Sequence, residues 1–354
     1  MKLEKVGLNM NFSIAKEKER VYLWDNMKFL LINLVVIGHF ADQYVDKSVD
    51  LRSLFFFIYI FHMPLFIFIT GLFSKSAING ERFKIEKVIA YFLLYAIIKI
   101  CFYYADTTWM DENHDFSLFS SKGVPWYLFA CGIWLCMTYL IRDLKPLVVL
   151  AISVVLAIFV GYDDSIKDIL CASRVMVYYP FFLLGYYMKQ ERIVKVVKRY
   201  KWTKFLAISI LVGTLIYVFQ NIEALYDFRP LLTGRNPYEE LDNAQYGFIY
   251  RVMYYIVVVI LSTSIIAITP KKKIPFVSRF GSRTLQVYFI HYFVLYILYN
   301  HKVGQLLCQL SPNHWEGIYV LLAIVTAFIL SFKVFEYPFQ KILKLSVGWA
   351  YRGK

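Results

Sequence analysis

The sequence predicts an all-α integral membrane protein with about ten transmembrane helices and with both termini on the cytoplasmic side. Three observations lead to this prediction. Of the 354 residues, 59% are hydrophobic and 19% are aromatic, which is unlike the composition of a soluble domain. The apolar residues gather into stretches near the length that a bilayer requires. Lys and Arg concentrate in alternate connecting segments, as they do in multi-pass membrane proteins.

Ten apolar stretches follow one another without an internal repeat or a dividing linker, so we predict a single membrane domain. The domain covers residues 27–340, between a cytoplasmic N-terminal segment, 1–26, and a cytoplasmic tail, 341–354. The fifth and ninth stretches are short, and the sixth carries an arginine. In order, the stretches are 27–45, 54–73, 87–105, 124–142, 145–161, 170–188, 203–221, 248–269, 284–300 and 315–335.

The distribution of positive charge predicts the orientation of the helices. With a cytoplasmic N-terminus, the inner segments hold most of the Lys and Arg residues, as the positive-inside rule requires. The net charge of +14 then reflects orientation and contact with lipid headgroups. A nucleic-acid partner would need a clustered basic surface on a soluble domain, so none is expected. The basic inner segments are 2–20, 75–87, 142–145, 189–204, 271–283 and 341–354, and the outer residues are Lys47, Arg52, Lys122, Lys167, Arg229, Arg235 and Lys302.

The cysteines and histidines predict no metal site. The five cysteines form no Cys-x-x-Cys pair, and the six histidines are scattered along the chain. These spacings fit neither a zinc site nor a disulfide framework. The sequence also holds no glycine-rich phosphate-binding loop. No resident metal is therefore expected.

Lys28 and His39 form the most informative pair of the first stretch. They lie eleven residues apart, so a helix would separate them by about 16 Å along its axis. Lys28 would then lie near the inner surface and His39 deep in the bilayer, where an ionisable group is costly and suggests a functional site. Imidazole is the usual general base near neutral pH, and Lys28 could hold an anion such as a phosphate. Alternatively, Lys28 extends to lipid headgroups and His39 is a packing residue with satisfied hydrogen bonds.

Two further groups could act with His39. Asp42 and the neighbouring glutamine share its helix face, so either could orient the imidazole, although Asp42 could equally face outer solvent. In the second stretch, Pro64 frees the Ile60 carbonyl and predicts a kink. His62 could reach a cavity from this kink or cap the freed carbonyl.

The longest outer loop, about 222–247, is rich in acidic, aromatic and planar polar side chains. Such groups suit a sugar, whereas the simpler interpretation is a solvated loop. The residues concerned are Glu223, Tyr226, Asp227, Arg229, Arg235, Asn236, Tyr238, Glu239, Glu240, Asp242, Asn243 and Gln245.

Six short motifs, in order and covering about residues 20–340, resemble the acyltransferase 3 family of integral membrane O-acyltransferases. The spacing Lys28-x10-His39 resembles the family's Arg/Lys-x10-His motif. Among its branches, the chain most resembles the fucose 4-O-acetylase-like proteins, which modify surface or secreted glycans. The other motifs are Phe61-His62-Met63-Pro64-Leu65-Phe66 with Thr70-Gly71, Val124-Pro125-Trp126-Tyr127-Leu128, Arg174 with Tyr179-Pro180-Phe181-Phe182-Leu183-Leu184-Gly185, Gly281-Ser282-Arg283-Thr284-Leu285 through Tyr288 and His291, and Phe335-Glu336-Tyr337-Pro338.

The resemblance implies that acetyl-CoA enters from the cytoplasm as the acyl donor and that a glycan hydroxyl is the acceptor. His39 takes the position of the family's catalytic histidine, and Lys28 that of its paired cation. Lysine stands here where arginine is common, which argues against a bidentate phosphate contact. Arg82, Lys84 and Lys87 take the position of a basic pair that would suit the phosphates of coenzyme A. Alternatively, these three residues are ordinary positive-inside charge.

Trp126, Arg174, Arg251 and His291 are the candidates for contact with the acceptor or the acyl group. Arg174 and Arg251 could hold an acceptor or a carbonyl oxygen, or extend to the outer headgroups. Trp126 could stack on a sugar or anchor the helix at the membrane interface. His291 could equally be a packed, hydrogen-bonded histidine. Glu336, near the inner end of the last stretch, is expected to pair with a loop cation.

The function predicted by the sequence is therefore O-acetyl transfer from acetyl-CoA to a cell-surface or secreted glycan, at a bacterial inner or plasma membrane. His39 would deprotonate the acceptor hydroxyl or carry the acetyl group transiently. The alternative is a transporter or glycan flippase without acyl transfer. Transporters often carry inverted repeats, and none is visible in the sequence.

Overall fold

A computed structural model describes residues 20–109, 116–119, 123–166, 169–197 and 202–344. Several predictions lie outside these residues. They concern most of the N-terminal segment, almost all of the C-terminal tail, and the loop cations Lys122, Lys167, Lys198, Arg199 and Lys201.

Every regular element of the described residues is a helix, and each of the ten apolar stretches corresponds to one α-helix. The all-α prediction is therefore confirmed for this part of the chain. The ten helices are α1 (Tyr22–Asp42), α2 (Val49–Ile78), α3 (Ile85–Trp109), α4 (Trp126–Leu140), α5 (Pro146–Phe159), α6 (Ala172–Tyr187), α8 (Trp202–Leu225), α10 (Gly247–Ile268), α12 (Leu285–Asn300) and α14 (Trp315–Leu330). Shorter helices connect them: α7 (Gln190–Val197), α9 (Arg229–Thr233), α11 (Val277–Phe280), α13 (Val303–Leu310), α15 (Lys333–Leu343) and the 3₁₀ turns η1 (Val160–Tyr162), η2 (Tyr226–Phe228), η3 (Tyr238–Glu240) and η4 (Ala244–Tyr246).

Four helical segments are long and apolar enough to cross a membrane, in agreement with a multi-pass membrane protein. They contain α2, α3, α8 and α10. A fifth span results if α14 and α15, which meet at an angle of 59°, are counted together. The α4 and α5 helices are apolar but shorter, and α2 continues as one helix through Pro64. Helix length and composition thus support four or five spans, while the larger number expected from the sequence stays a prediction.

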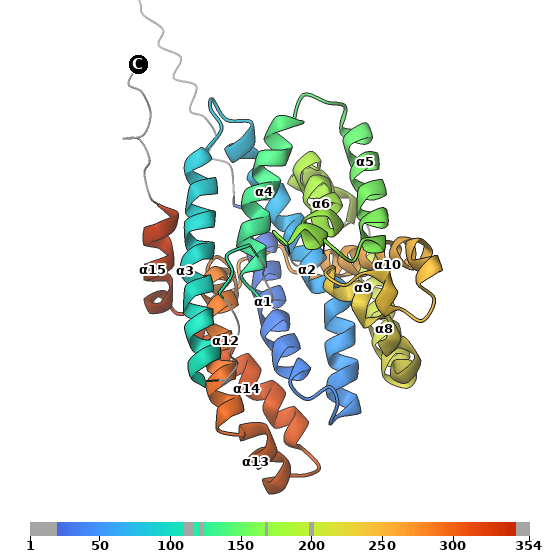
Figure 1. Ribbon diagram of the computed structural model, residues 1–354, viewed down its shortest axis with the longest axis vertical. Coiled ribbons are helices and arrows are strands. Elements are labelled where there is room, and N and C mark those ends of the chain that lie inside the picture. The colour runs from blue at the N-terminus through green and yellow to red at the C-terminus, as the bar shows by residue number, and fades with distance from the viewer. Residues whose placement is uncertain (1–19, 110–115, 120–122, 167–168, 198–201, 345–354) are drawn as a thin grey trace, which may run out of the picture.

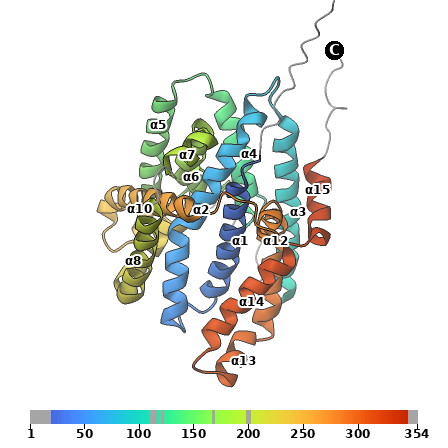
Figure 2. The same cartoon turned by 180° about the vertical axis from the view of Figure 1, so that it is seen from behind.

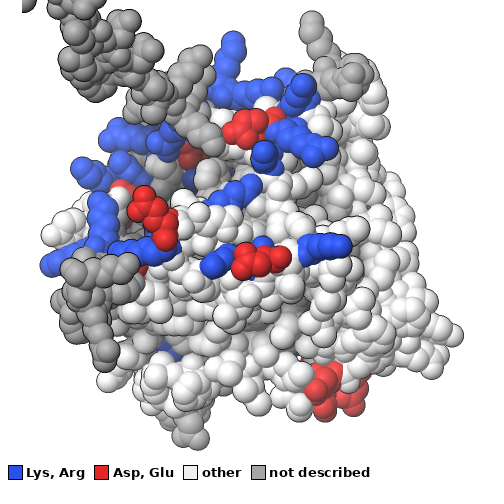
Figure 3. Space-filling view, turned by 90° about the horizontal axis from the view of Figure 1, so that it is seen from above, with Lys and Arg blue, Asp and Glu red and all other residues white. Residues whose placement is uncertain are grey.

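Helix α2 lies at the centre of the molecule, where it packs against α1 on one side and α6 on the other (Figures 1 and 2). The connections between α2 and α3 and between α4 and α5 lie at one end of the molecule, and α13 lies at the opposite end. The first of these ends carries many Lys and Arg side chains and few acidic ones (Figure 3). Such an asymmetric face is what the positive-inside rule expects of one membrane surface.

Two glycines allow α2 and α6 to cross at very short range. A Cβ atom added to Gly71 would lie 2.0 Å from the Phe182 carbonyl oxygen, and one added to Gly185 would lie 2.0 Å from that of Phe68. Both glycines belong to motifs quoted above, so these motifs have a packing role. Small residues at helix crossings are a common means of bringing backbones together in membrane proteins.

Replacing Gly71 with Ala is therefore expected to destabilise the folded protein. The new methyl group would push α6 away from α2, and overpacking of this kind costs about 1–3 kcal/mol. Thermal unfolding of the purified protein in detergent would measure the effect as a lower midpoint. Gly213→Ala in α8 is the matched control, because a Cβ there meets no atom within 4 Å. Equal midpoints for the two variants would contradict the close crossing.

The start of α1 is fixed to the connection between α10 and α12. The Asn26 side chain donates to the carbonyl oxygens of Pro270 and Lys272, both at 2.9 Å, and accepts from the Ser278 hydroxyl at 2.6 Å. Gly281 packs directly on the Asp25 backbone, where a Cβ atom would lie 1.7 Å from the carbonyl oxygen. These contacts set the position of the helix that carries the candidate catalytic histidine.

Glu336 forms an ion pair with Arg283, whose Nε lies 3.1 Å from Oε2. Both side chains are largely buried. The pair joins α15 to the start of α12, and the expected pairing of Glu336 with a loop cation is confirmed.

Candidate active site

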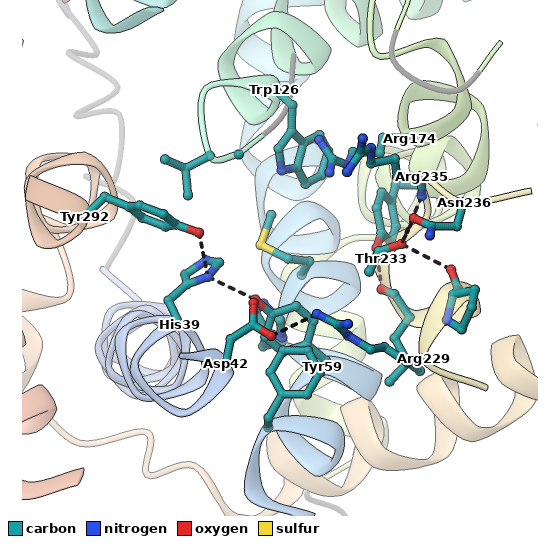
Figure 4. A pocket seen from close by; sticks show the side chains of 18 of the residues that line it. His39, Asp42, Tyr59, Trp126, Arg174, Arg229, Thr233, Arg235, Asn236 and Tyr292 are labelled. Atoms are coloured by element: carbon teal, nitrogen blue, oxygen red, sulfur yellow. Dashed lines mark hydrogen bonds and ion pairs between the residues drawn. The ribbon is translucent and has the colours of Figure 1, made fainter. Parts of the chain in front are cut away.

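A cavity of about 360 Å³ lies between α1, α2, α4, α6, α9 and α12. Five of the residues predicted from the sequence line it: His39, Asp42, His62, Trp126 and Arg174. In Figure 4, His39 and Tyr292 face Arg229 and Asn236 across the cavity. Its other lining residues are Phe55, Tyr59, Met63, Gly123, Val124, Tyr178, Pro230, Leu232, Thr233, Arg235, Glu240 and Tyr288.

The His39 imidazole is oriented by two tyrosines from other helices. Its Nδ1 atom lies 2.9 Å from the Tyr59 hydroxyl of α2 and 3.1 Å from the Tyr292 hydroxyl of α12 (Figure 4). Nδ1 carries either one lone pair or one proton. It can therefore form an in-plane hydrogen bond with only one of the two tyrosines at a time. When Nδ1–H donates to a tyrosine oxygen, Nε2 is unprotonated and can accept a proton. This tautomer suits a general base.

Removing both hydroxyls with Tyr59→Phe and Tyr292→Phe is expected to lower kcat for acyl transfer while leaving KM nearly unchanged. Each single variant keeps one partner for Nδ1, so its kcat should fall less than tenfold. The double variant should lose about 10–100-fold, the range found when contacts that orient metal-binding histidines are removed. Steady-state kinetics on the purified single and double variants would measure this. Each variant has a fold-loss in kcat. If the loss of the double variant did not exceed the product of the losses of the two single variants, the tyrosines would not share an orienting role.

Asp42 pairs with an arginine of the outer loop, and its predicted role in orienting the imidazole stays a prediction. Its Oδ1 pairs with Arg229 Nη2 of α9 at 3.0 Å. Neither Asp42 nor the neighbouring glutamine is a partner of His39 Nδ1, because the two tyrosines occupy that nitrogen. The carboxylate instead ties the end of α1 to the loop that borders the cavity.

His62 lines the cavity and does not cap the carbonyl freed by the proline. Its Nδ1 lies 2.9 Å from the Ile58 carbonyl oxygen, four residues earlier in α2, and not at the Ile60 oxygen. Its ring centroid lies 4.7 Å from that of Tyr59, with the planes at 63°. His62 thus supports a tyrosine that contacts His39.

Trp126 and Arg174 form one wall of the cavity. The Arg174 guanidinium carbon lies 5.1 Å from the centroid of the Trp126 ring, a distance at which a cation is attracted to an aromatic face. Trp126 also stacks on Tyr178, with centroids 5.5 Å apart. Only 6% of Trp126 and 8% of Arg174 is exposed. These positions agree with a role inside the cavity and not with anchoring at the membrane surface.

Arg251 and His291 lie behind the lining of the cavity. The buried Arg251 donates from Nη1 to the Leu231 carbonyl oxygen at 2.7 Å and from Nε to the Tyr238 hydroxyl at 3.4 Å, so it holds the loop in place. His291 stacks on His39 with ring centroids 5.3 Å apart and bonds the Val287 carbonyl oxygen through Nδ1 at 2.8 Å. Neither side chain lines the cavity, although His291 packs on His39, which does; direct contact of Arg251 or His291 with the acceptor stays a prediction.

The long outer loop is folded over the cavity. Thr233 donates to the Asn236 side-chain oxygen at 3.0 Å, and the backbone around them is held by α6. Ser173 donates to the Gly234 carbonyl oxygen, and the Tyr178 hydroxyl donates to that of Leu232, both at 2.9 Å. The interpretation as a freely solvated loop is therefore wrong for the part that lines the cavity.

The predicted donor-binding cations lie outside this cavity. Lys28 Nζ pairs with Asp25 Oδ1 at 3.0 Å near the start of α1, so it has a protein partner in addition to any anion it binds. At the α2–α3 connection, Arg82 pairs with Glu86 at 3.5 Å and Lys87 lies over the Tyr91 ring. Lys84 is exposed. Because α1 is one continuous helix, Lys28 and His39 stay about 16 Å apart along its axis.

The two tyrosines around His39 are not evident from the sequence. Tyr59 is three residues before His62, and Tyr292 follows His291, so each lies beside a residue that drew attention. With 29 tyrosines in the chain, however, nothing in the sequence distinguishes these two. Among the described residues, no three His, Cys, Asp or Glu side chains gather in a way that could hold a metal ion.

Comparison with known proteins agrees with the family that the motifs resemble. Residues 21–332 match the family described as "Acyltransferase domain". The nodulation protein NolL of Mesorhizobium japonicum is 25% identical over 60% of this chain, and that of Sinorhizobium fredii is 27% identical over 50%. The matches span 62% and 50% of the lengths of those two relatives. No solved structure matches the chain. The chain thus belongs to the acyltransferase 3 family of membrane proteins.

Proposed function

We propose that the protein transfers an acetyl group from cytoplasmic acetyl-CoA to a hydroxyl group of a cell-surface or secreted glycan. The observation that carries this proposal is the cavity itself. In it, the imidazole of His39 lies opposite a loop with arginine, amide and hydroxyl groups, and Trp126 lines the same cavity. Aromatic faces and planar polar groups of this kind suit a sugar ring with its many hydroxyls.

The proposed chemistry begins with proton transfer from the acceptor hydroxyl to His39 Nε2. The oxygen then attacks the thioester carbonyl carbon, and the negative charge that develops on the carbonyl oxygen is stabilised by a nearby cation. Arg174 is the best-placed buried cation of the cavity lining. When the carbon–sulfur bond breaks, the coenzyme A sulfur leaves and takes the proton from His39. In the alternative route, His39 Nε2 attacks the thioester carbon first, and coenzyme A leaves as a thiolate that takes up the Nδ1 proton. The acceptor hydroxyl then takes the acetyl group from the imidazole, and its proton returns to the ring.

The donor would approach from the end of the molecule that is rich in Lys and Arg. Lys28, Arg82, Lys84 and Lys87 are proposed to bind its phosphates, and the pantetheine arm would cover the distance of about 16 Å to His39. With ten spans and both termini in the cytoplasm, a cytoplasmic donor and an external acceptor could meet without either crossing the bilayer fully. We place the protein in a bacterial cell membrane because its relatives are rhizobial.

Membership of an acyltransferase family favours this enzyme over the alternative of a transporter or flippase. Mass spectrometry of surface and secreted glycans would test the proposal in a deletion strain carrying the wild-type gene, the His39→Ala gene or no gene. Acetylated glycan is expected only with the wild-type gene. A surface glycan that is exported normally in the deletion strain, but without acetyl groups, would exclude a flippase. Unchanged acetylation in the deletion strain would exclude the proposed enzyme for that glycan.

A further inference from the structure

A second cavity, of about 340 Å³, lies between α2, α6, α7 and α10, and we call it the basic groove. Most of its lining is hydrocarbon or aromatic, such as Phe68 of α2, Leu184 of α6 and Val259 of α10. Helices α2 and α10 are among those long and apolar enough to span the membrane, and Val259 is 48% exposed. The basic groove therefore opens on a surface that faces lipid, and a molecule that fills it needs an apolar part.

Two cations also line the basic groove. Lys189 comes directly before α7 and Arg192 lies in its first turn, and no acidic residue is among the described residues of the lining. Glu191, between them in the sequence, does not line the groove. Two other apolar cavities of the described chain, one beside α8 and one beside α1, have no charged lining residue of either sign. The positive charge is thus particular to this groove and is not shared by every cavity on the lipid-facing surface.

The cations lie near the face of the molecule that is rich in Lys and Arg. Lys75, in the last turn of α2, donates through Nζ to the carbonyl oxygen of Met188, which lines the groove next to Lys189. The connection between α2 and α3, which follows Lys75, lies at that face (Figures 1 and 3). The lining also includes Pro64, eleven residues before Lys75 and therefore about 16 Å away along α2. The basic groove thus reaches from a charged face of the molecule into its apolar part.

Ser262 of α10 adds an unsatisfied hydroxyl to the lining. It lies one turn from Val258 and one turn from Ile266, and all three line the groove. The Ser262 hydroxyl oxygen is buried and has no hydrogen-bond partner among the described residues. A buried polar group usually has a partner, and an ester or phosphate oxygen of a ligand would supply one here. The groove therefore offers a hydrogen-bond donor as well as positive charge and an apolar surface.

We propose that the basic groove binds a phospholipid of net negative charge from the membrane leaflet at this face. Lys189 and Arg192 hold its phosphate, and Ser262 donates to a phosphate or glycerol-ester oxygen. An acyl chain lies along the apolar lining between α2 and α10. Basic pockets between membrane helices bind anionic lipid headgroups in the same way. A soluble anion would gain nothing from the apolar lining, and an uncharged hydrocarbon would gain nothing from the cations.

The bound lipid would support the close crossing of α2 and α6. Phe68 and Leu184 line the groove, and the Phe68 carbonyl oxygen is the atom that approaches Gly185 most closely. Helix α2 also carries Tyr59 and His62 to the active-site cavity. A ligand that binds only the folded protein stabilises it by mass action. The protein is therefore expected to unfold at a higher temperature in a bilayer that contains the anionic lipid.

Native mass spectrometry of the purified, delipidated full chain would measure the affinity for added lipid. The probes are phosphatidylglycerol and phosphatidylcholine with the same acyl chains, and the wild type is expected to bind the first at least tenfold more tightly. The double variant Lys189→Gln/Arg192→Gln should bind phosphatidylglycerol at least tenfold more weakly, because each cation near the membrane surface contributes about fivefold. Lys195→Gln is the matched control, since Lys195 is an exposed cation of α7 outside the lining, and its affinity should stay within twofold.

A second variant tests the apolar part of the groove without changing any charge. Val259→Phe places a larger side chain at the groove and should weaken the binding of both lipids at least fivefold. Ile256→Phe is its matched control, because Ile256 is also exposed on α10 but lies outside the lining. Binding to Ile256→Phe should equal binding to the wild type. Equal binding to Val259→Phe and Ile256→Phe would exclude an acyl chain in the groove.

Thermal unfolding in nanodiscs of either lipid provides a second measurement. The wild-type midpoint should be higher in phosphatidylglycerol, and the double variant should fold in both lipids but lose this difference. Equal losses of affinity in the double variant and in Lys195→Gln would overturn the assignment, since the attraction would then belong to the whole basic face. Equal wild-type affinity for the two lipids would overturn it too. Displacement of the lipid by soluble glycerol phosphate would indicate a site for free phosphate and would exclude the lipid.

Discussion

Replacing His39 with Ala is expected to lower kcat/KM for acetyl transfer by about 10²–10⁴-fold, the contribution typical of a positioned general base. The imidazole lines the cavity, and two tyrosine hydroxyls hold its Nδ1 atom, which leaves Nε2 for the acceptor. Two other histidines lie nearby in the described part of the chain. His62 bonds the Ile58 carbonyl, and His291 lies behind the lining. The loss should therefore appear in chemistry and not in folding.

Steady-state kinetics on purified protein, with thermal unfolding as the folding control, would measure the effect of His39→Ala. His301→Ala is the matched control, since His301 lies at the end of α12, outside the cavity lining. Its activity should stay within twofold of the wild type. Single-turnover labelling with acetyl-CoA alone would then separate the two routes: a labelled His39 peptide would indicate the acetyl-histidine route. A His39→Ala protein with more than a tenth of wild-type activity would refute the site assignment.

Replacing Arg174 with Gln is the second change with a large expected effect, a loss of about 10²–10³-fold in kcat. Arg174 is buried, lines the cavity and lies against the Trp126 ring. A cation in this position can stabilise the oxyanion that forms as the acceptor attacks. Arg174→Lys keeps the charge but not the planar contact with the ring, so an intermediate loss is expected.

The division of this effect between kcat and KM would reveal what Arg174 contacts. A fall in kcat alone indicates transition-state stabilisation, and a rise in KM alone indicates binding of the acceptor. Arg142→Gln is the matched control, because Arg142 also lies over an aromatic ring, that of Tyr139 at 4.0 Å, but outside the cavity lining. If Arg174→Gln and Arg142→Gln had the same small effect, Arg174 would have no role in the reaction.

Much of the fold follows from local features of the sequence. Each apolar stretch became a helix, because runs of about twenty apolar residues have few other stable forms within a bilayer. The individual boundaries differ by several residues, most clearly in α2, which begins at Val49 and ends at Ile78. Its polar ends carry the helix beyond its apolar part, and hydropathy does not register such extensions.

The candidate site was predicted only in part. His39, Asp42, His62, Trp126 and Arg174 drew attention because polar or motif-bearing residues in apolar segments are conspicuous, and all five line the cavity. Arg251 was equally conspicuous, yet it supports the loop from behind. Burial of a charged group within a helix indicates that it has partners. It does not indicate whether those partners are substrate or protein.

The sequence by itself determined that the chain is a helical membrane protein, which residues are costly to bury, and which family its motifs resemble. Tertiary structure alone decided that Tyr59 and Tyr292 hold His39, that Asp42 pairs with Arg229, and that α9 borders the polar cavity. The physical reason is how far apart along the chain the interacting residues lie. Hydropathy and helix length are properties of neighbouring residues, whereas these contacts join residues of different helices and arise only when the helices pack.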